Sequence, residues 1–432
     1  MNKRSFFTAM TMMMGTGAVF VPATVFADAL SLGEAIKIGR ESSPDIKQLE
    51  AQYLSAVQKT NFALAPGEPT ISIMHNDLST ALNIGTAAST QIQLTQPIGF
   101  PGRAVLNRAQ LTDQANAIQY QLSALNLQVS VNIKTAYYNL QLAQRNIQLN
   151  ADTRLAYERI LEVTRRRYES GATGQVDFLN AQVSLLSNEN DLADLQTAEK
   201  IARAQLNVML KRPSDAAVEV EPIKMVDLPE INPREAIDKM VENRNEIKAA
   251  QAQQKAADKS YQLAWMGLLP DFQLILGTTQ YHESYASPYS GVPALAGNWP
   301  TTTYMVGVQF TVPIWFMFNE RASIRGASFD RASADHNVDV VLNQSKMALE
   351  NAVDAIHSTA IKIQNFEKHI LPLSDQSFKL ALIDYSSGRI NFQTLSDTAA
   401  ARRQARLNYA TAVVAYLTNY ATYGQLIGED FQ

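Results

Sequence analysis

The residues of this sequence whose side chains could do chemistry are scattered rather than grouped. A zinc site built on a helix needs two histidines four residues apart, and no two histidines here have that spacing. His357 shares a predicted helix face with Glu350 and Asp354, an arrangement typical of solvated surface pairing. The five histidines are His75, His282, His336, His357 and His369.

Other reactive patterns are missing from the sequence as well. It contains no Cys, which excludes disulfides, thiolate metal sites and a thiol nucleophile. It contains no Gly-x-Ser-x-Gly segment and no phosphate-binding loop. The sequence therefore predicts a protein that is not an enzyme and that holds neither a metal ion nor a cofactor.

Length, charge and the first residues suggest export. The chain has 432 residues and a formal net charge of -4, which disfavours nucleic-acid binding because phosphate contacts need a basic face. Lys3 and Arg4 precede an apolar stretch from Phe6 to Phe20, and small residues follow up to Ala27. A membrane anchor would need roughly 20 apolar residues. We therefore expect residues 1–27 to be a signal peptide.

The mature sequence is an internal duplication. Glu34-Ala35-Ile36 recurs as Glu235-Ala236-Ile237, and Tyr168-Glu169-Ser170-Gly171 recurs as Tyr385-Ser386-Ser387-Gly388. One loop insertion between His282 and Thr302 accounts for most of the change in offset. The sequence thus predicts a first structural repeat at 28–212, a proline-rich connector at 213–233 and a second repeat at 234–432.

Each repeat has the pattern of a helix, two strands and two further helices. Helices are predicted over 32–65, 103–167 and 176–211 in the first repeat, and over 234–266, 319–384 and 393–427 in the second. Strands with period-2 alternation are predicted over 70–74, 90–96, 271–281 and 303–313. A soluble, half-buried sheet has the same alternation, so the strands alone do not define the environment.

The longest helices carry a coiled-coil repeat. From Arg103 to Arg167 there is no Pro or Gly, and apolar residues recur at spacings of 7, 4 and 3. Such a helix is about 100 Å long at 1.5 Å per residue. The return helix and the first helix of each repeat together match this length. We therefore expect a long rod with a sheet at one end and helix turns at the other.

Four strands per chain leave two open sheet edges. In a bilayer only a closed barrel satisfies every strand amide. Two copies give eight strands and three give twelve, and only the larger barrel has room for a lumen. The aromatic residues near the strand ends fit an interfacial girdle, although ordinary core packing remains open for each. They include Tyr281, Tyr304, Trp315 and Phe316.

In these features the sequence resembles the TolC-type outer membrane efflux proteins. The resemblance rests on the duplication, the Glu-Ala-Ile starts, Gln96-Pro97-Ile98 and Val312-Pro313-Ile314, and the two Tyr-x-x-Gly turns. The segment Phe100-Pro101-Gly102-Arg103 is more similar to the heavy-metal-efflux (CzcC-like) branch. The fold class implied is an α+β membrane protein. Long coiled-coil helices form a periplasmic α-barrel, and four strands per chain complete a trimeric twelve-stranded outer-membrane β-barrel.

The resemblance also implies partners. The chain would form a homotrimer in outer-membrane lipid, with a large periplasmic portion, and would act as a passive, gated exit duct. A periplasmic adaptor (membrane fusion) protein and an inner-membrane pump, with the RND type favoured, would dock at the helix turns and supply the transport energy.

The resemblance assigns candidate gating residues near the turns Tyr168, Gly171 and Gly388. It pairs Asp177 with the hydroxyl of Tyr385 as a latch that holds the inner helix pair closed. A second latch is in doubt because the position of the family's Arg holds Ile390, with Arg389 one residue earlier.

The same resemblance places rings of inward-facing acids at positions that hold Thr394 and Asp397 here, so a trimer would keep one ring of three Asp397 side chains. Three carboxylates near one axis would favour cations.

Simpler roles remain open for these residues. Asp177 follows a helix start and could serve only the helix dipole, and Asp397 could be a solvated helix residue. The run Arg165-Arg166-Arg167 could contact an acidic adaptor tip or form a charged helix surface. Two other functions also remain open, namely the outer membrane duct of a type I protein secretion system and a trimeric structural or adhesive coiled coil.

Overall fold

The structure is a computed structural model, and it describes residues 29–80, 83–223, 229–281, 302–312, 314–315 and 317–431. The predicted signal peptide and the predicted loop insertion, within residues 282–301, lie outside the described residues. So do Pro313 at the end of the last predicted strand and Phe316 of the predicted girdle. Among the described residues, no helix is both long enough and apolar enough to cross a membrane.

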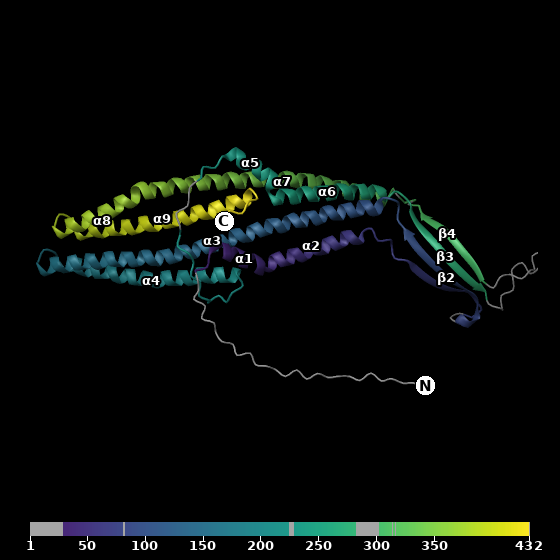
Figure 1. Ribbon diagram of the computed structural model, residues 1–432, viewed down its shortest axis with the longest axis horizontal. Helices are drawn as coiled ribbons and strands as arrows, with labels where there is room; N and C mark the ends of the chain where they lie inside the picture. Colours follow the sequence, from purple (N-terminus) through teal and green to yellow (C-terminus); the bar gives the residue numbers. More distant parts are fainter. Residues whose placement is uncertain are drawn as a thin grey trace, which may run out of the picture.

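The first repeat places its helices in a long rod with a sheet at one end (Figure 1). Two short helices, α1 (Leu32–Ser42) and α2 (Pro44–Phe62), lead to the strands β1 (Thr70–Leu78) and β2 (Ala87–Ile98), which a short 3-10 turn at Ile84–Thr86 connects. The long helix α3 (Arg103–Glu169) then runs to the far end, and α4 (Gln175–Met209) returns. The order of elements in this half is the predicted one.

The second repeat follows the same course. It contains α5 (Pro233–Asn243), α6 (Asn245–Met266), β3 (Asp271–Tyr281) and β4 (Thr302–Thr311). The outward path is α7 (Glu320–Asn365), the π-helical turn η2 (Phe366–Ile370) and α8 (Leu371–Ser386), and α9 (Phe392–Leu426) returns. Hence each repeat ends in a helical hairpin whose turn lies at the end of the rod opposite the sheet (Figure 1).

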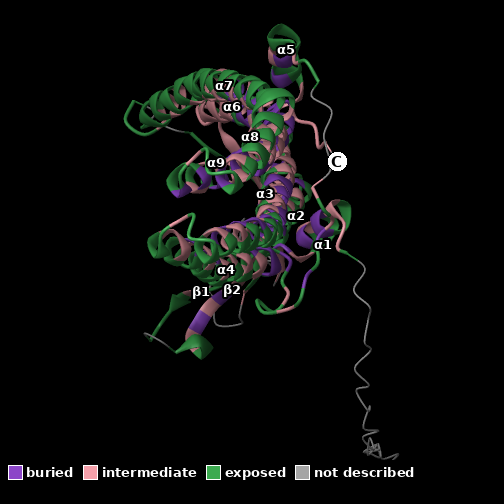
Figure 2. Ribbon diagram, turned by 90° about the vertical axis from the view of Figure 1, so that its left-hand side faces the viewer, coloured by how far each residue is buried: buried purple, intermediate pink, exposed green. Residues whose placement is uncertain are grey.

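The first helix of each repeat is broken, which corrects the prediction of single helices over 32–65 and 234–266. Ser43 has an extended backbone (φ -61°, ψ 122°) because the residue before a proline avoids the helical region, and its side chain caps α2. Arg244 adopts the same conformation (φ -63°, ψ 120°) without a following proline. The break turns α1 and α5 onto the convex side of the curved row of helices (Figure 2).

The second long helix is also interrupted. The structure contains a five-residue π turn at Phe366–Ile370 within the helix predicted over 319–384. Pro372 lies in the first turn of α8, directly after this π turn. A proline inside a helix removes one backbone hydrogen bond, and a local π turn accommodates that loss.

The four strands form one antiparallel sheet in the order β1-β2-β3-β4. Strands β2 and β3, from different repeats, pair from Ser89 with Tyr281 to Ile98 with Phe272, so the sheet joins the two halves. One face of β4 is strongly exposed, with Tyr304 84%, Val306 76% and Val308 67% exposed. β1 and β4 each have one strand neighbour, so both outer edges of the sheet lack a partner among the described residues.

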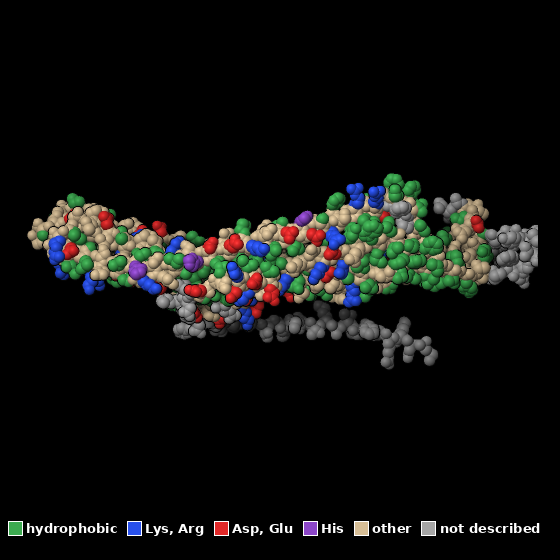
Figure 3. Space-filling view, turned by 90° about the horizontal axis from the view of Figure 1, so that it is seen from above, with side chains coloured by type: hydrophobic (Ala, Val, Ile, Leu, Met, Phe, Trp, Pro, Cys, Tyr) green, Lys and Arg blue, Asp and Glu red, His purple; other side chains and the backbone are tan. Residues whose placement is uncertain are grey.

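The hydrophobic surface does not end with the strands. Trp315 and Phe318, which follow β4, are 65% and 73% exposed and lie with their ring centroids 6.3 Å apart. Hydrophobic side chains cover the part of the helical surface next to the sheet, whereas charged side chains gather toward the middle of the rod (Figure 3). Such a band of exposed apolar and aromatic residues is typical of a surface that contacts lipid.

Three buried clusters hold the helices together. In the first repeat, Ala35 and Ile36 of α1 pack with Ile133 and Leu140 of α3 and with Leu206 of α4. In the second, α5 makes the equivalent contact with α7 and α9 around Met240, Leu349 and Tyr416. The third cluster lies toward the helix turns and joins the two repeats.

Candidate gate at the helix turns

The two hairpin turns have the same backbone geometry. In the first, the Ala172 amide donates to the Arg167 carbonyl at 2.8 Å, and Gly171 has φ 71°. In the second, the Arg389 amide donates to the Asp384 carbonyl at 2.8 Å, and Gly388 has φ 78°. These are Schellman motifs, in which a left-handed glycine lets the last carbonyls of the helix find donors. The duplicated Tyr-x-x-Gly sequence therefore encodes two equal turns.

Tyr168 and Tyr385 occupy equivalent positions in the sequence but have different surroundings. Tyr168 is 42% exposed, and its ring stacks on that of Phe178 at 5.9 Å. Tyr385 is 1% exposed, and its ring makes an edge contact with that of Phe392 at 6.1 Å. The second tyrosine is thus enclosed between the hairpins, while the first is part of the outer surface of its own hairpin.

The hydrogen bond predicted between Asp177 and Tyr385 is not formed within this chain. Asp177 lies in the first turn of α4, and its carboxylate accepts a hydrogen bond from the hydroxyl of Thr173. The Tyr385 hydroxyl is buried and has no hydrogen-bond partner among the described residues. The Thr173–Asp177 bond closes the first turn locally, as expected of an acidic side chain near a helix N-terminus.

The other candidate residues lie close together after the second turn. Arg389 forms an ion pair with Asp384 at 2.9 Å, and its side chain is 69% exposed. The Thr394 amide and hydroxyl both donate to Asn391, which caps α9. Asp397 is exposed and accepts a hydrogen bond from Gln393 at 2.7 Å. Arg389 is therefore bound within its own turn, whereas Asp397 remains open to solvent on the first turns of α9.

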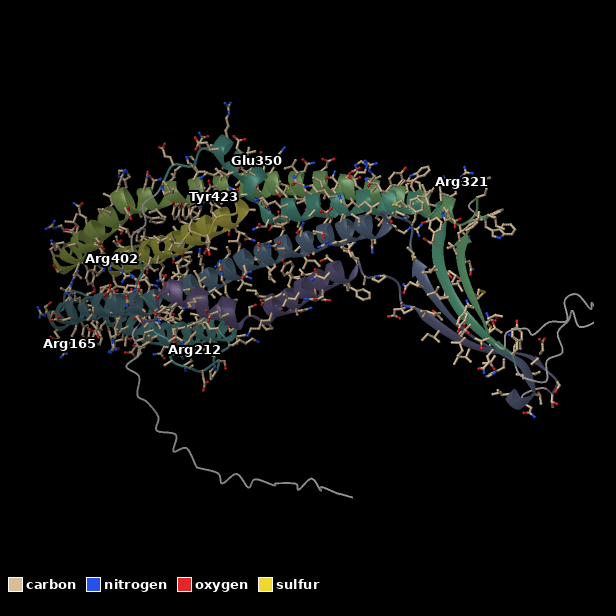
Figure 4. The ribbon with its side chains drawn as sticks, turned by 45° about the vertical axis from the view of Figure 1, so that its right-hand side comes forward. Arg165, Arg212, Arg321, Glu350, Arg402 and Tyr423 are labelled. Atoms are coloured by element: carbon tan, nitrogen blue, oxygen red, sulfur yellow. The ribbon has the colours of Figure 1, made fainter. Side chains whose placement is uncertain are left out.

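One residue of the arginine run, for which the sequence suggested an adaptor contact or a charged helix surface, connects the two turns instead. The Arg167 guanidinium donates to the Tyr385 carbonyl through Nη1 and to the Ala172 carbonyl through Nη2 at 3.1 Å. The same group lies 4.5 Å from the centre of the Tyr385 ring. Its neighbours Arg165 and Arg166 point to solvent and pair with Glu169 and Glu162 of their own helix. Figure 4 shows Arg165 at this end of the rod, opposite Arg321 at the sheet.

Further ion pairs join the hairpins above the turns. Arg403 of α9 pairs with Asp191 of α4 at 2.6 Å, and Arg406 of α9 lies 3.5 Å from Asp152 of α3. Within the second hairpin, partial burial acts to raise the pKa of Asp375. The hydrogen bond from Arg402 and the charge of Arg406 outweigh this effect and hold the pKa of Asp375 below its usual value. That carboxylate is thus kept ionised beside Arg402 and Arg406, and Arg406 also reaches Asp152 of the first hairpin.

Apolar contacts accompany these polar links. Ile160 of α3 and Leu395 of α9 are 1% and 0% exposed and belong to one cluster with Phe378 of α8. The described residues contain no group of three or more His, Asp or Glu side chains arranged to hold a metal ion. This end of the molecule is therefore a contact between two helical hairpins, formed by side chains of both repeats.

Comparison with known proteins gives a consistent result. The model of the family described as outer membrane efflux protein matches residues 35–210 and 236–429. The cobalt-zinc-cadmium resistance protein CzcC of Cupriavidus metallidurans is 21% identical over 400 residues, covering 91% of this chain and 89% of that protein.

Solved structures of similar fold include outer-membrane channels. The CusC structure has a TM-score of 0.77 at 15% identity and covers 92% of each chain. The outer membrane protein VceC of Vibrio cholerae has a TM-score of 0.76 at 14% identity, with 93% of this chain and 97% of that chain covered. The open state of the MtrE channel of Neisseria gonorrhoeae has a TM-score of 0.73 at 16% identity, with 92% and 89% covered.

Proposed function

Because this chain belongs to the outer membrane efflux protein family, we propose that it forms a gated exit duct whose periplasmic entrance is the pair of helix turns. In this proposal the chain is the outer membrane channel of a tripartite efflux system. We place the proposed gate at the turns because of the geometry of the two helical hairpins. Two equal turns lie at the end of the rod opposite the sheet, and buried contacts hold one hairpin against the other.

The proposed assembly is a homotrimer. A sheet whose two edges lack partners cannot span a bilayer alone, since unpaired amides have no donors or acceptors in lipid. Pairing β4 of one chain with β1 of the next in three copies closes a twelve-stranded barrel, which is wide enough for a lumen. The exposed apolar face of β4 and the rings of Trp315 and Phe318 would then contact outer-membrane lipid.

The proposed partners are a periplasmic adaptor and an inner-membrane pump of the RND type. The turns offer the adaptor two exposed arginines, Arg165 and Arg166, which pair with glutamates one helical turn away. A divalent metal cation is the proposed cargo, because the name of the relative CzcC refers to cobalt, zinc and cadmium. Since the chain would act as a passive duct, it would not need to bind the metal itself.

The proposal is tested by single-channel recording of the purified trimer in a planar bilayer. We expect rare, small, cation-selective openings, because the contacts between the hairpins would keep the proposed entrance narrow at rest and its acidic side chains would favour cations. A folded trimer that shows no conductance at any voltage would contradict the duct and favour a structural coiled coil.

The Asp397 ring gives a second test. Replacing Asp397 with Asn should reduce the preference for cations over anions several-fold, because three carboxylates around one axis would be lost. Asp238→Asn is the matched control, since Asp238 is an exposed acid on α5, far from the turns. The measurement is the reversal potential in a salt gradient. Equal reversal potentials for the two variants would place Asp397 outside the conduction path.

A further inference from the structure

The first turn holds the second turn through one side chain. Arg167 belongs to the last turn of α3, yet its guanidinium reaches the carbonyl of Tyr385 in the last turn of α8. It also donates to the Ala172 carbonyl, which lies just beyond Gly171 in its own turn. One planar group therefore links carbonyls from the two hairpins.

The chemistry of this contact requires arginine. Its planar group presents several donors in a fixed fork, so two carbonyls and an aromatic face can be satisfied together. The ring of Tyr385 lies 4.5 Å from the guanidinium carbon, within the range of a cation–π contact. A Cβ atom built on Gly388 would lie 3.5 Å from Nη2, so the arginine also packs against the second turn itself. A lysine has one charged group and could not make all of these contacts at once.

Among the described residues, the side chains of the predicted latches form no hydrogen bond between the two turns. Asp177 accepts a hydrogen bond from Thr173 in the first turn, and the buried Tyr385 hydroxyl has no hydrogen-bond partner in the part of the chain that the structure describes. Arg389 is bound to Asp384 within the second turn. Arg167 thus links the first turn to the second. It contacts the backbone carbonyl and the ring face of Tyr385, and not the Tyr385 hydroxyl.

We infer that Arg167 is the positioning residue of the gate, holding the α8–α9 turn against the α3–α4 turn in the closed state. Opening then requires the guanidinium to leave the Tyr385 carbonyl and ring, while Arg403 and Arg406 keep the hairpins joined above the turns. This inference rests on the proposed gate at the helix turns.

The test compares three variants of the full trimer. In Arg167→Gln the charge and the fork are lost, and in Arg167→Lys the charge remains without the fork. Arg154→Gln is the control, because Arg154 lies on the same helix and pairs with Glu158 and Glu189 within the first hairpin, away from its turn. Charged hydrogen bonds are individually strong, so we expect the open probability of Arg167→Gln to rise about tenfold or more. Arg167→Lys should show a smaller rise, and Arg154→Gln should match the wild type.

A second readout does not depend on conduction. Because the sequence has no Cys, spin labels can be placed only where cysteines are introduced, here at the exposed Ser170 and Ser386 of the two turns. We expect the distance distribution between these labels to broaden and shift outward in Arg167→Gln but not in Arg154→Gln. Thermal unfolding of each trimer shows whether the change is confined to the turns.

The outcomes separate the inference from the function on which it rests. If the wild type conducts and Arg167→Gln matches it in both open probability and label distance, Arg167 does not position the gate. A silent wild type would contradict the duct, while the label distances would still decide whether Arg167 holds the turns together. If Arg167→Gln does not assemble, Arg167→Lys decides the matter, and wild-type behaviour of that variant would overturn the inference.

Discussion

Replacing Asp430 with Asn is expected to lower the free energy of unfolding by about 3–5 kcal/mol, which is typical of breaking a buried ion pair. The Lys134 side chain is 2% exposed, and its ammonium group lies 2.6 Å from Asp430 Oδ1. The same ammonium donates to the Phe431 carbonyl, and Arg40 binds the other oxygen of Asp430. Without the carboxylate, Lys134 remains buried with no counter-charge, which is why the expected effect is large.

The same segment of the chain supplies the control. Glu429 pairs with Lys239 at 3.4 Å, and the two side chains are 37% and 51% exposed. Exposed pairs contribute little to stability, so Glu429→Gln should change the unfolding midpoint only slightly. The measurement is thermal or denaturant unfolding of the detergent-solubilised trimer, followed by circular dichroism.

A double variant identifies the cause. Lys134→Met in the Asp430→Asn background should recover much of the lost stability, because it removes the uncompensated buried charge. Equal destabilisation by Asp430→Asn and Glu429→Gln, or no recovery in the double variant, would show that the buried ion pair does not hold the C-terminal segment.

Replacing Gly428 with Ala is expected to destabilise the protein by roughly 2–4 kcal/mol, combining backbone strain with a steric clash. Gly428 has φ 77°, a left-handed conformation that disfavours residues with a Cβ atom. A Cβ atom at this position would also lie 2.8 Å from the Asn243 carbonyl oxygen, which is backbone and cannot rotate away. The clash would push the end of α9 away from the junction between α5 and α6.

Gly171 separates these two effects. It has φ 71°, but no atom lies within 4 Å of the position of its Cβ. Gly171→Ala should therefore show the strain alone, about 1 kcal/mol. A difference of at least about 1 kcal/mol between the two variants in the same unfolding experiment is expected. Equal destabilisation by Gly428→Ala and Gly171→Ala would mean that the structure around Asn243 adjusts to the added Cβ atom without loss of stability.

Much of the fold follows from periodicity and duplication. The uninterrupted heptad pattern from Arg103 predicted α3, because no Pro or Gly breaks it, and the alternation over 271–281 matched β3 residue for residue. The breaks were not predicted. Pro44 could have indicated the first, since the residue before proline avoids the helix. Arg244 has no such neighbour, and the break there accompanies the packing of α5 around Met240.

The candidate gate was less accessible to sequence reasoning. The two Tyr-x-x-Gly turns were recognisable because a left-handed glycine is a local requirement. The partner of each side chain depends on how two hairpins meet, and no local pattern states this. The run of three arginines indicated a possible contact near the turn, but it did not indicate which of the three would make it. Only the packing shows that Arg165 and Arg166 are exposed while Arg167 contacts Tyr385.

The open edges of the sheet have a consequence for biogenesis. A single chain that met the bilayer would carry the unpaired amide groups of β1 and β4 into hydrocarbon, at several kcal/mol for each group. If the proposed trimer forms, its assembly would precede or accompany insertion, and the rate of channel formation should depend on protein concentration more steeply than linearly. A co-expressed chain with intact helices but a β4 edge blocked by proline would enter mixed trimers and arrest them before insertion, so that one defective allele would be dominant over the normal one.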